Sequence, residues 1–338
     1  MKKRFFNFSK AVLYILLPFA AIVLSITVGR YGVSIKEVIL SILQALGFVS
    51  DAVSKEAYTV VVHLRIPRAV AAAVVGAGLA TSGAAYQGVF KNPLVNSGLL
   101  GVSNGAAFGA ALAIIFFGGA LSTNISAFIF GILAMALSYW IAKIYKQVPT
   151  VMLILGGTIV SSIFSSLLTM LKAIADTGNE LPAIVYWTMG SVASVQYKDF
   201  WALIPIIIGI VIILLFSHEI NVISIGEKQA RTMGINVKRS KTFIITAATL
   251  STAGAVCLSG VVGWVGLVIP HIGRMVAGND NKKLIPVSMS VGAVFMVIID
   301  TVSRSLTSSE IPLSVLTSLI GAPFFIYLLK KTKGGGWA

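Results

Sequence analysis

The sequence predicts an all-α polytopic membrane protein with about ten transmembrane helices. Of its 338 residues, 57% are hydrophobic and only 11% are charged, with a mean hydropathy of +0.94. Ordinary soluble domains carry about 25% charged residues, so this chain has too little polar surface to stay in solution. The apolar residues are gathered into long segments, and the excess of basic residues falls between alternate segments. These three observations together favour a membrane-spanning helical bundle.

Ten segments are apolar enough to cross a bilayer, which takes about 20 predominantly apolar residues. The eighth is the shortest, and none alternates with the period of two that a transmembrane β-barrel requires. In chain order they are residues 11–29, 66–89, 98–117, 125–144, 150–171, 200–217, 241–259, 261–276, 285–303 and 312–329.

The first segment follows Lys2-Lys3-Arg4 and so imitates a secretory signal peptide. No convincing small-residue cleavage site follows it at Val28-Gly29-Arg30, and we expect a retained first helix. The single cysteine, Cys257, lies in an apolar segment and can form no disulfide within the chain.

Small residues mark the second and third segments. Gly76, Gly78 and Gly83 could suggest a dinucleotide-binding loop, but such a loop needs a preceding strand, which this sequence does not predict. Gly101, Gly105 and Gly109 repeat at intervals of four residues. In both segments, small residues that let another helix approach closely are the favoured interpretation.

The distribution of charge orients the ten-span arrangement. One side holds both termini and the even-numbered loops, with 18 basic and three acidic residues, whereas the other holds eight of each. Because positively charged loops stay in the cytoplasm, both termini should be cytoplasmic in the cell membrane. The net charge of +15 is thereby explained without a nucleic-acid partner.

The sequence predicts one permease domain, residues 1–338, with no polar domain or linker. Its longest extracytoplasmic connections are residues 31–65 and 173–199, and the most polar cytoplasmic segment is 218–240. Residues 81–85 of the second span show a faint sequence similarity to residues 252–256 of the seventh. These spans run in opposite directions, as an inverted repeat of the kind common in transporters would require.

Catalytic and ATP-binding motifs are absent from the sequence. There is no GxxxxGK[ST] loop, and His63, His218 and His271 are too far apart to predict a metal site. Asp300 is the one acid well inside a span, and Arg304 follows it one turn later, so a local ion pair is favoured over an ion-coupling role. The scarcity of such residues disfavours a secondary transporter driven by an ion gradient, which is retained as the alternative. A channel-like or structural membrane protein is the third reading.

Residues 223–235 form a short amphipathic cytoplasmic segment with a glycine near each end. The pattern fits a solvated loop helix and a docking element for a cytoplasmic partner equally well.

Several motifs in order resemble the FecCD-type permease family, the membrane subunits of type II ABC importers for iron–siderophore complexes, haem and vitamin B12. The resemblance covers nearly the whole chain. The motifs lie at residues 65–68 (RIPR), 82–87, 92–94 (NPL), 98–105 (GLLGVSNG), 226–234, 263–274 (GWVGLVIPHIGR), 310–312 and 321–323.

The resemblance implies a type II ABC importer permease fold and alternating access without bond chemistry in this chain. It implies a second permease subunit, identical or paralogous, two ATPase subunits that bind ATP and Mg, and an extracytoplasmic substrate-binding protein. It implies no cofactor or metal bound by the chain itself. Ferric siderophore is the first expectation for the substrate, and haem or cobalamin remain open.

The resemblance also assigns roles to residues. ATPase coupling falls on Gly226, Glu227, Ala230, Arg231 and Gly234. Docking of the binding protein falls on Arg65, Arg68 and Arg304, although the spacing from Arg304 to the Glu310-Ile311-Pro312 motif is one residue shorter than in the family.

Two further groups concern the transport route. The expected cytoplasmic gate is formed by Asn92 and Thr150. A polar run in the fifth span lines the pathway or, equally well, bonds to its own helix backbone; its members are Thr158, Ser161, Ser162, Ser165 and Ser166.

Overall fold

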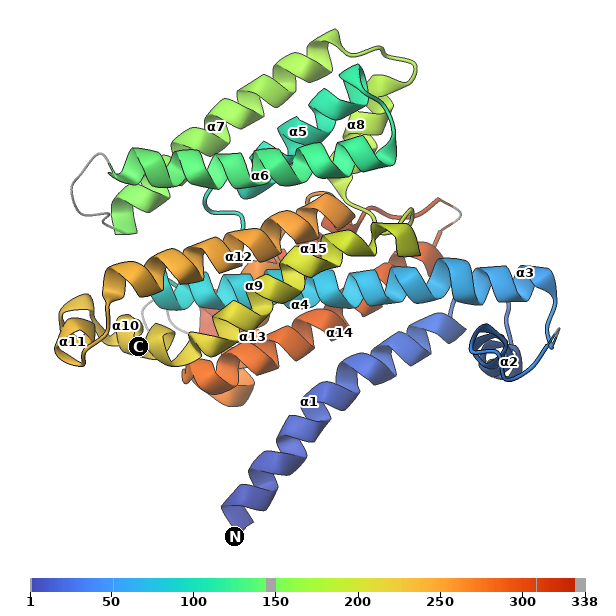
Figure 1. Cartoon of the computed structure of the whole chain (residues 1–338), viewed down its shortest axis with the longest axis horizontal. Coiled ribbons are helices and arrows are strands. Elements are labelled where there is room, and N and C mark those ends of the chain that lie inside the picture. Colours follow the sequence, from blue (N-terminus) through green and yellow to red (C-terminus); the bar gives the residue numbers. More distant parts are fainter. Residues whose placement is uncertain (1, 51, 144–149, 308, 332–338) are drawn as a thin grey trace.

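The computed structural model describes residues 2–50, 52–143, 150–307 and 309–331, which are helical with no strand among them. Figure 1 shows a central bundle, a second layer formed by α5 to α8, and α1 leaning away from both. The elements are α1 (Lys2–Thr27), α2 (Ile35–Ala45), α3 (Lys55–Tyr58), η1 (Thr59–Arg65), α4 (Ile66–Phe90), α5 (Val102–Phe116), α6 (Ala120–Lys143), α7 (Thr150–Ile174), α8 (Glu180–Met189), η2 (Tyr197–Ala202), α9 (Leu203–Leu215), α10 (Ser217–Ile225), α11 (Glu227–Thr232), α12 (Val237–Ser259), α13 (Val265–Ala277), α14 (Asn281–Ser305) and α15 (Leu313–Lys331).

The all-α membrane fold predicted from the sequence is confirmed. Within the described residues, six helices are long and apolar enough to cross a membrane, and shorter apolar helices lie at the four remaining predicted spans. The latter are the apolar parts of α1, α5, α13 and α15. The exact number of crossings therefore stays a prediction.

Helix α4 lies at the centre of the bundle and is buried along nearly its whole length. It packs against α9, α12, α13 and α14. A helix that is apolar on every side belongs in such a position. Helix α12 runs antiparallel to it, since Ser82 donates to the carbonyl of Ala248 (3.0 Å) and Tyr86, one turn later along α4, donates to the carbonyl of Ile245 (3.4 Å), one turn earlier along α12.

Glycines set how closely these helices approach. A Cβ on Gly83 would collide with the carbonyl oxygen of Gly266 in α13, and Gly76 meets Gly292 of α14 in the same way. In the outer layer, a Cβ on Gly105 would lie 2.5 Å from the carbonyl oxygen of Phe130 in α6. The prediction that these glycines serve helix packing is confirmed.

The two long connections are more structured than the sequence suggests. Residues 55–65, predicted as part of a loop, form α3 and η1 and extend α4 without a break. Ser54 starts this extension by accepting a hydrogen bond from the Ala57 amide (3.2 Å). Helix α2 begins with a capping box between Ser34 and Glu37, which lowers the pKa of the Glu37 carboxyl. The other connection contains α8.

Candidate transport and coupling sites

Arg68 lies at the start of α4, at the end of the bundle that also holds the last turn of α14. Its Nε donates to both carboxylate oxygens of Asp300 (2.8 and 3.0 Å). Its two terminal nitrogens reach Glu310 at 2.7 and 3.0 Å. One guanidinium thus holds two carboxylates through paired hydrogen bonds, the strongest geometry such a pair can adopt.

The two other arginines tie α1 to the same cluster. Arg304 donates to the carbonyl oxygen (2.5 Å) and hydroxyl (2.9 Å) of Ser25. Arg65 donates to the carbonyl oxygens of Ile26 (2.8 Å) and Tyr31 (2.5 Å). We term these three arginines, with Asp300 and Glu310, the arginine cluster.

The predicted docking residues are therefore brought together, but not as a rim of free charges. Arg65, Arg68 and Arg304 are each at least nine-tenths buried and occupied by partners within the chain. The local pair expected between Asp300 and Arg304 is only a 3.7 Å contact, and the main partner of Asp300 is Arg68. Three cations and two carboxylates leave the arginine cluster with one excess positive charge.

The opposite end of the bundle carries α10 and α11 (Figure 1). The segment expected to be one amphipathic helix is two short helices joined at Gly226. Ala230 is fully buried and anchors α11 against the bundle, whereas Arg231 and Met233 are exposed. Helix α11 therefore presents a basic and apolar surface to its surroundings.

Each coupling glycine has a local reason. A Cβ on Gly226 would collide with the Gln229 side chain. Gly234 follows α11 with φ of +80°, and the Ile235 amide bonds back to the carbonyl of Ala230 (3.0 Å), which is the usual glycine-terminated helix end. The carboxylate of Glu227 accepts from Lys241 at the start of α12. The predicted coupling residues thus form one compact structural unit.

Helix α10 is joined to α14 through Asn221, a contact that the sequence did not indicate. The Asn221 amide donates to Asp280 (2.6 Å), and its oxygen accepts from the backbone and side chain of Asn281 (2.7 and 2.8 Å). The hydrogen bond from Asn221 lowers the pKa of the Asp280 carboxyl below its ordinary value.

The loop after α4 carries Asn92 and is bonded to α13. Asn92 caps its own turn by accepting from the Leu94 amide (2.9 Å). His271 of α13 bonds the carbonyl of Pro93 (3.1 Å), and Arg274 donates to Gln87 of α4 (2.6 Å). Gln87, His271 and Arg274 fall within motifs quoted above, and polar groups inside apolar segments were the signal that could have selected them.

The second expected gate residue, Thr150, is the first residue of α7, and its side chain lies outside the described part. Farther along α7, Ser162, Ser165 and Ser166 are exposed. Thr158 instead bonds back to the carbonyl of Leu155 (2.8 Å). The backbone carbonyl of Ser161 accepts from Asn104 of α5 (3.3 Å). Thr158 therefore shows the backbone-bonded arrangement, and the lining of the pathway by this polar run stays a prediction.

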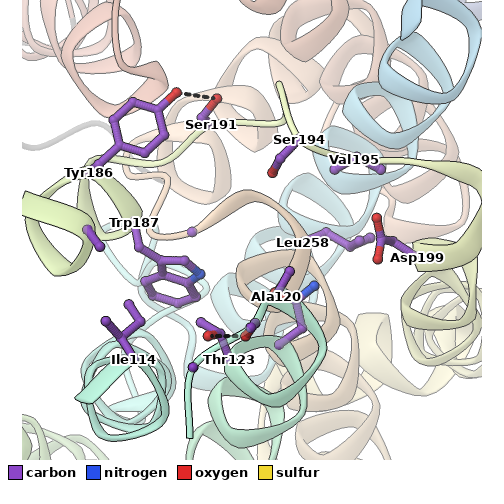
Figure 2. Close-up of a pocket in the computed structure, with 15 residues that line it drawn as sticks. Ile114, Ala120, Thr123, Tyr186, Trp187, Ser191, Ser194, Val195, Asp199 and Leu258 are labelled. Atoms are coloured by element: carbon purple, nitrogen blue, oxygen red, sulfur yellow. Dashed lines mark hydrogen bonds between the residues drawn. The ribbon is translucent and has the colours of Figure 1, made fainter. Parts of the chain in front are cut away.

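Figure 2 shows a cavity of about 390 Å³ where the α5–α6 connection, α8 and the end of α12 meet. The Trp187 indole points into it, with Ile114 and Thr123 below and Asp199 on the far side beyond Leu258. The Asp199 carboxylate accepts from the Gln196 amide (2.9 Å). We term this the Asp199 cavity; its one charged lining group is negative.

Long apolar helices, with a buried ion cluster at one end of the bundle and an exposed two-helix element at the other, are the features expected of a multi-pass membrane protein. A profile of the FecCD transport family matches residues 16–331, and the chain belongs to that family. It is thus a permease subunit of an ABC importer, a class in which a separate subunit hydrolyses ATP.

The individual proteins that the chain resembles are all parts of transporters, but their names state different substrates. The chain is 40% identical to the molybdate import permease MolB of Haemophilus influenzae over 317 residues, 93% of each protein. It is 38% identical to the cobalamin import permease BtuC of Halobacterium salinarum over 82% of this chain and 75% of that protein. A solved structure described as an inward-facing metal-chelate type ABC transporter matches with a TM-score of 0.85 and 37% identity, covering 96% and 99% of the two chains.

Proposed function

We propose that the chain imports a metal-containing substrate by alternating access, together with a second permease, two ATPase subunits that bind ATP and Mg, and an extracytoplasmic binding protein. The observation that carries this is the α10–α11 unit. It is exposed on one side and fixed on the other to α14 and α12. An element built this way can bind a partner on its exposed side and transmit the movement of that partner to the membrane helices on its other side. ATP and Mg belong on the partner ATPase.

In the proposed orientation, α10–α11 and both termini lie in the cytoplasm and the arginine cluster lies outside, which the positive-inside bias of the sequence supports. The excess positive charge of the cluster would attract an acidic binding-protein surface and align it on approach. The guanidinium groups of Arg65, Arg68 and Arg304 would act through this field and by holding α1, α4 and α14 together. Direct contact of each arginine with the partner is not supported by their burial.

The route of transport runs along α7, whose hydroxyl groups at Ser162, Ser165 and Ser166 are exposed. The loop at Asn92, fixed by His271 and Gln87, and the start of α7 at Thr150 close it on the cytoplasmic side. The second permease would pack against the exposed apolar face of α7, which includes Leu155, Ile159 and Ile163.

The substrate is a metal chelate or a metal oxyanion. Ferric siderophore is the specific expectation, and haem and cobalamin are alternatives. The relatives named for molybdate, cobalamin and a metal chelate support the broader class.

Uptake in cells with and without the gene tests the proposal. Labelled molybdate, ferric siderophores, haem and cobalamin are supplied in parallel, first with ATP depleted and then with the ion gradient collapsed. We expect one substrate to lose its ATP-dependent uptake in cells that lack the gene. Uptake that survives ATP depletion and falls with the gradient would instead support the secondary transporter.

An Arg231→Glu variant tests coupling within the same assay. Reversing the charge of this exposed residue should lower the initial uptake rate about tenfold, which corresponds to about 1.4 kcal/mol of docking free energy. The amount of chain in the membrane should not change. Lys36→Glu, an exposed charge reversal on α2 at the other end, is the matched control and should transport normally.

A further inference from the structure

The Asp199 cavity has a volume of about 390 Å³, which suits a small organic molecule. Its walls are largely apolar and aromatic, since the Trp187 indole points into the space and Ile114 and Leu258 also line it (Figure 2). The transport and coupling roles proposed above use none of these residues. A concave apolar space with few polar groups is the usual form of a small-molecule binding site.

Asp199 supplies this cavity with a carboxylate on a residue that is only 7% exposed. The carboxylate accepts from the Gln196 amide (2.9 Å), which is its one hydrogen bond within the described residues. No described lysine, arginine or histidine forms a salt bridge with it. Buried carboxylates are normally paired with a cation, because burial of an unpaired charge is costly. Asp199 is therefore a buried charge for which the described part of the chain supplies no counter-charge.

Helix ends add partial negative charge at the same place. The last turns of α5, α8 and α12 reach the cavity through Ile114, Trp187 and Leu258. A helix C-terminus carries partial negative charge, and none of these three described helices has a basic residue in its last turn. Helix α6 begins at the cavity with Ala120, and its positive end offsets one of the three. Since no basic side chain is among the lining residues described, the cavity is electronegative overall.

We propose that the Asp199 cavity binds a small organic cation whose charged nitrogen carries alkyl groups, as in a quaternary ammonium compound. The carboxylate of Asp199 pairs with the charge, the Trp187 ring attracts it through a cation–π contact, and the apolar wall covers the alkyl groups. A bare metal cation would need several oxygen ligands, whereas one acidic side chain lines the described cavity. Because Asp199 is nearly covered, a free small molecule fits better than the side chain of a partner protein. The site does not depend on the proposed importer function.

Equilibrium binding to the full-length chain in nanodiscs of zwitterionic lipid tests the site. The probe is radiolabelled tetramethylammonium, and tert-butanol serves as an uncharged competitor of similar shape. We expect saturable binding that unlabelled tetramethylammonium displaces and tert-butanol does not. Asp199→Asn keeps an oxygen for the Gln196 amide but removes the charge, and it should weaken binding about tenfold. Asp176→Asn alters an exposed carboxylate that likewise accepts from a backbone amide, that of Asn179 (3.0 Å), and this matched control should bind as the wild type does.

A pair of Trp187 variants tests the aromatic wall and keeps the test decisive if Asp199→Asn fails to fold, which its thermal midpoint would report. Trp187→Leu should weaken binding several-fold and Trp187→Phe should retain it, because a cation–π contact needs an aromatic ring. Absence of saturable binding, equal affinity in the two aspartate variants, or equal displacement by tert-butanol would overturn the site. A Trp187→Leu protein that binds as tightly as Trp187→Phe would overturn it as well.

Discussion

A single residue, Asp300, shows how a charge is tolerated in the interior of this bundle. Its carboxylate is 1% exposed, yet it accepts two hydrogen bonds from Arg68 and lies near Arg304. Burial of an unpaired carboxylate would cost several kcal/mol, and the paired guanidinium offsets that cost only while both partners are present. Asp300 is therefore best understood as the centre of the joint between α4 and α14.

Asp300→Asn should destabilise the folded chain by about 3–5 kcal/mol, because Arg68 would keep its burial and lose its main counter-charge. The free energy of unfolding in detergent, or the midpoint of thermal unfolding, measures the effect. Glu310→Gln removes the more exposed of the two partners of Arg68 and should cost clearly less. Equal losses in the two variants would contradict a central role for Asp300.

Among the elements, α4 depends most on the small size of its residues. Gly83 faces the carbonyl oxygen of Gly266 so closely that no side chain fits between them. In lipid, close packing of this kind substitutes for the hydrophobic effect between helices. The glycines of α4 thus contribute to the packing energy between α4 and α13 by allowing the two helices to approach closely.

Gly83→Ala should cost about 3 kcal/mol, at the upper end for an overpacked core, because backbone has to move rather than a flexible side chain. The yield of folded protein and its thermal midpoint report the change. Gly32→Ala, where an added Cβ meets no atom within 4 Å, is the control and should leave both unchanged. A Gly83→Ala protein as stable as this control would contradict the packing of α4 against α13.

The sequence predicts the helices well where they are long and apolar, and less well where they are polar. The span predicted at residues 66–89 is α4, Ile66–Phe90, because burial on every side makes the whole element apolar. The polar extension at residues 55–65 was missed because its helix starts at the Ser54 cap, outside any apolar run. Within the sites, Gly226 and Gly234 were found from their motif, but the pairing of Arg68 with Asp300 joins residues 232 positions apart. No local pattern encodes such a contact.

At the scale of the whole molecule, α14 connects the two functional ends. Its first residue, Asn281, is bonded to Asn221 of α10, and its last turn holds Asp300 and Arg304 in the arginine cluster. A helix of 25 residues rises about 37 Å, enough to span the bilayer. A displacement of α10 would therefore reach the opposite face through one continuous helix, without any relay of loops.

Asn221→Ala should weaken this connection while leaving the exposed surface of α11 intact. The one hydrogen bond that the Asn221 side chain donates and the two that it accepts are the polar link between α10 and the start of α14. We expect the reconstituted importer to move several-fold less substrate per ATP hydrolysed, because the ATPase still docks but its movement is no longer transmitted from α10 to α14. The scale follows from the loss of about 1 kcal/mol for each hydrogen bond removed. Ser224→Ala, on the same helix but bonded only to the carbonyl of Asn221, is the control and should keep the wild-type ratio. If ATP hydrolysis and transport fell together in Asn221→Ala, Asn221 would serve docking of the ATPase instead. If the amount of substrate moved per ATP were unchanged in Asn221→Ala, α14 would not be the route by which force crosses the membrane.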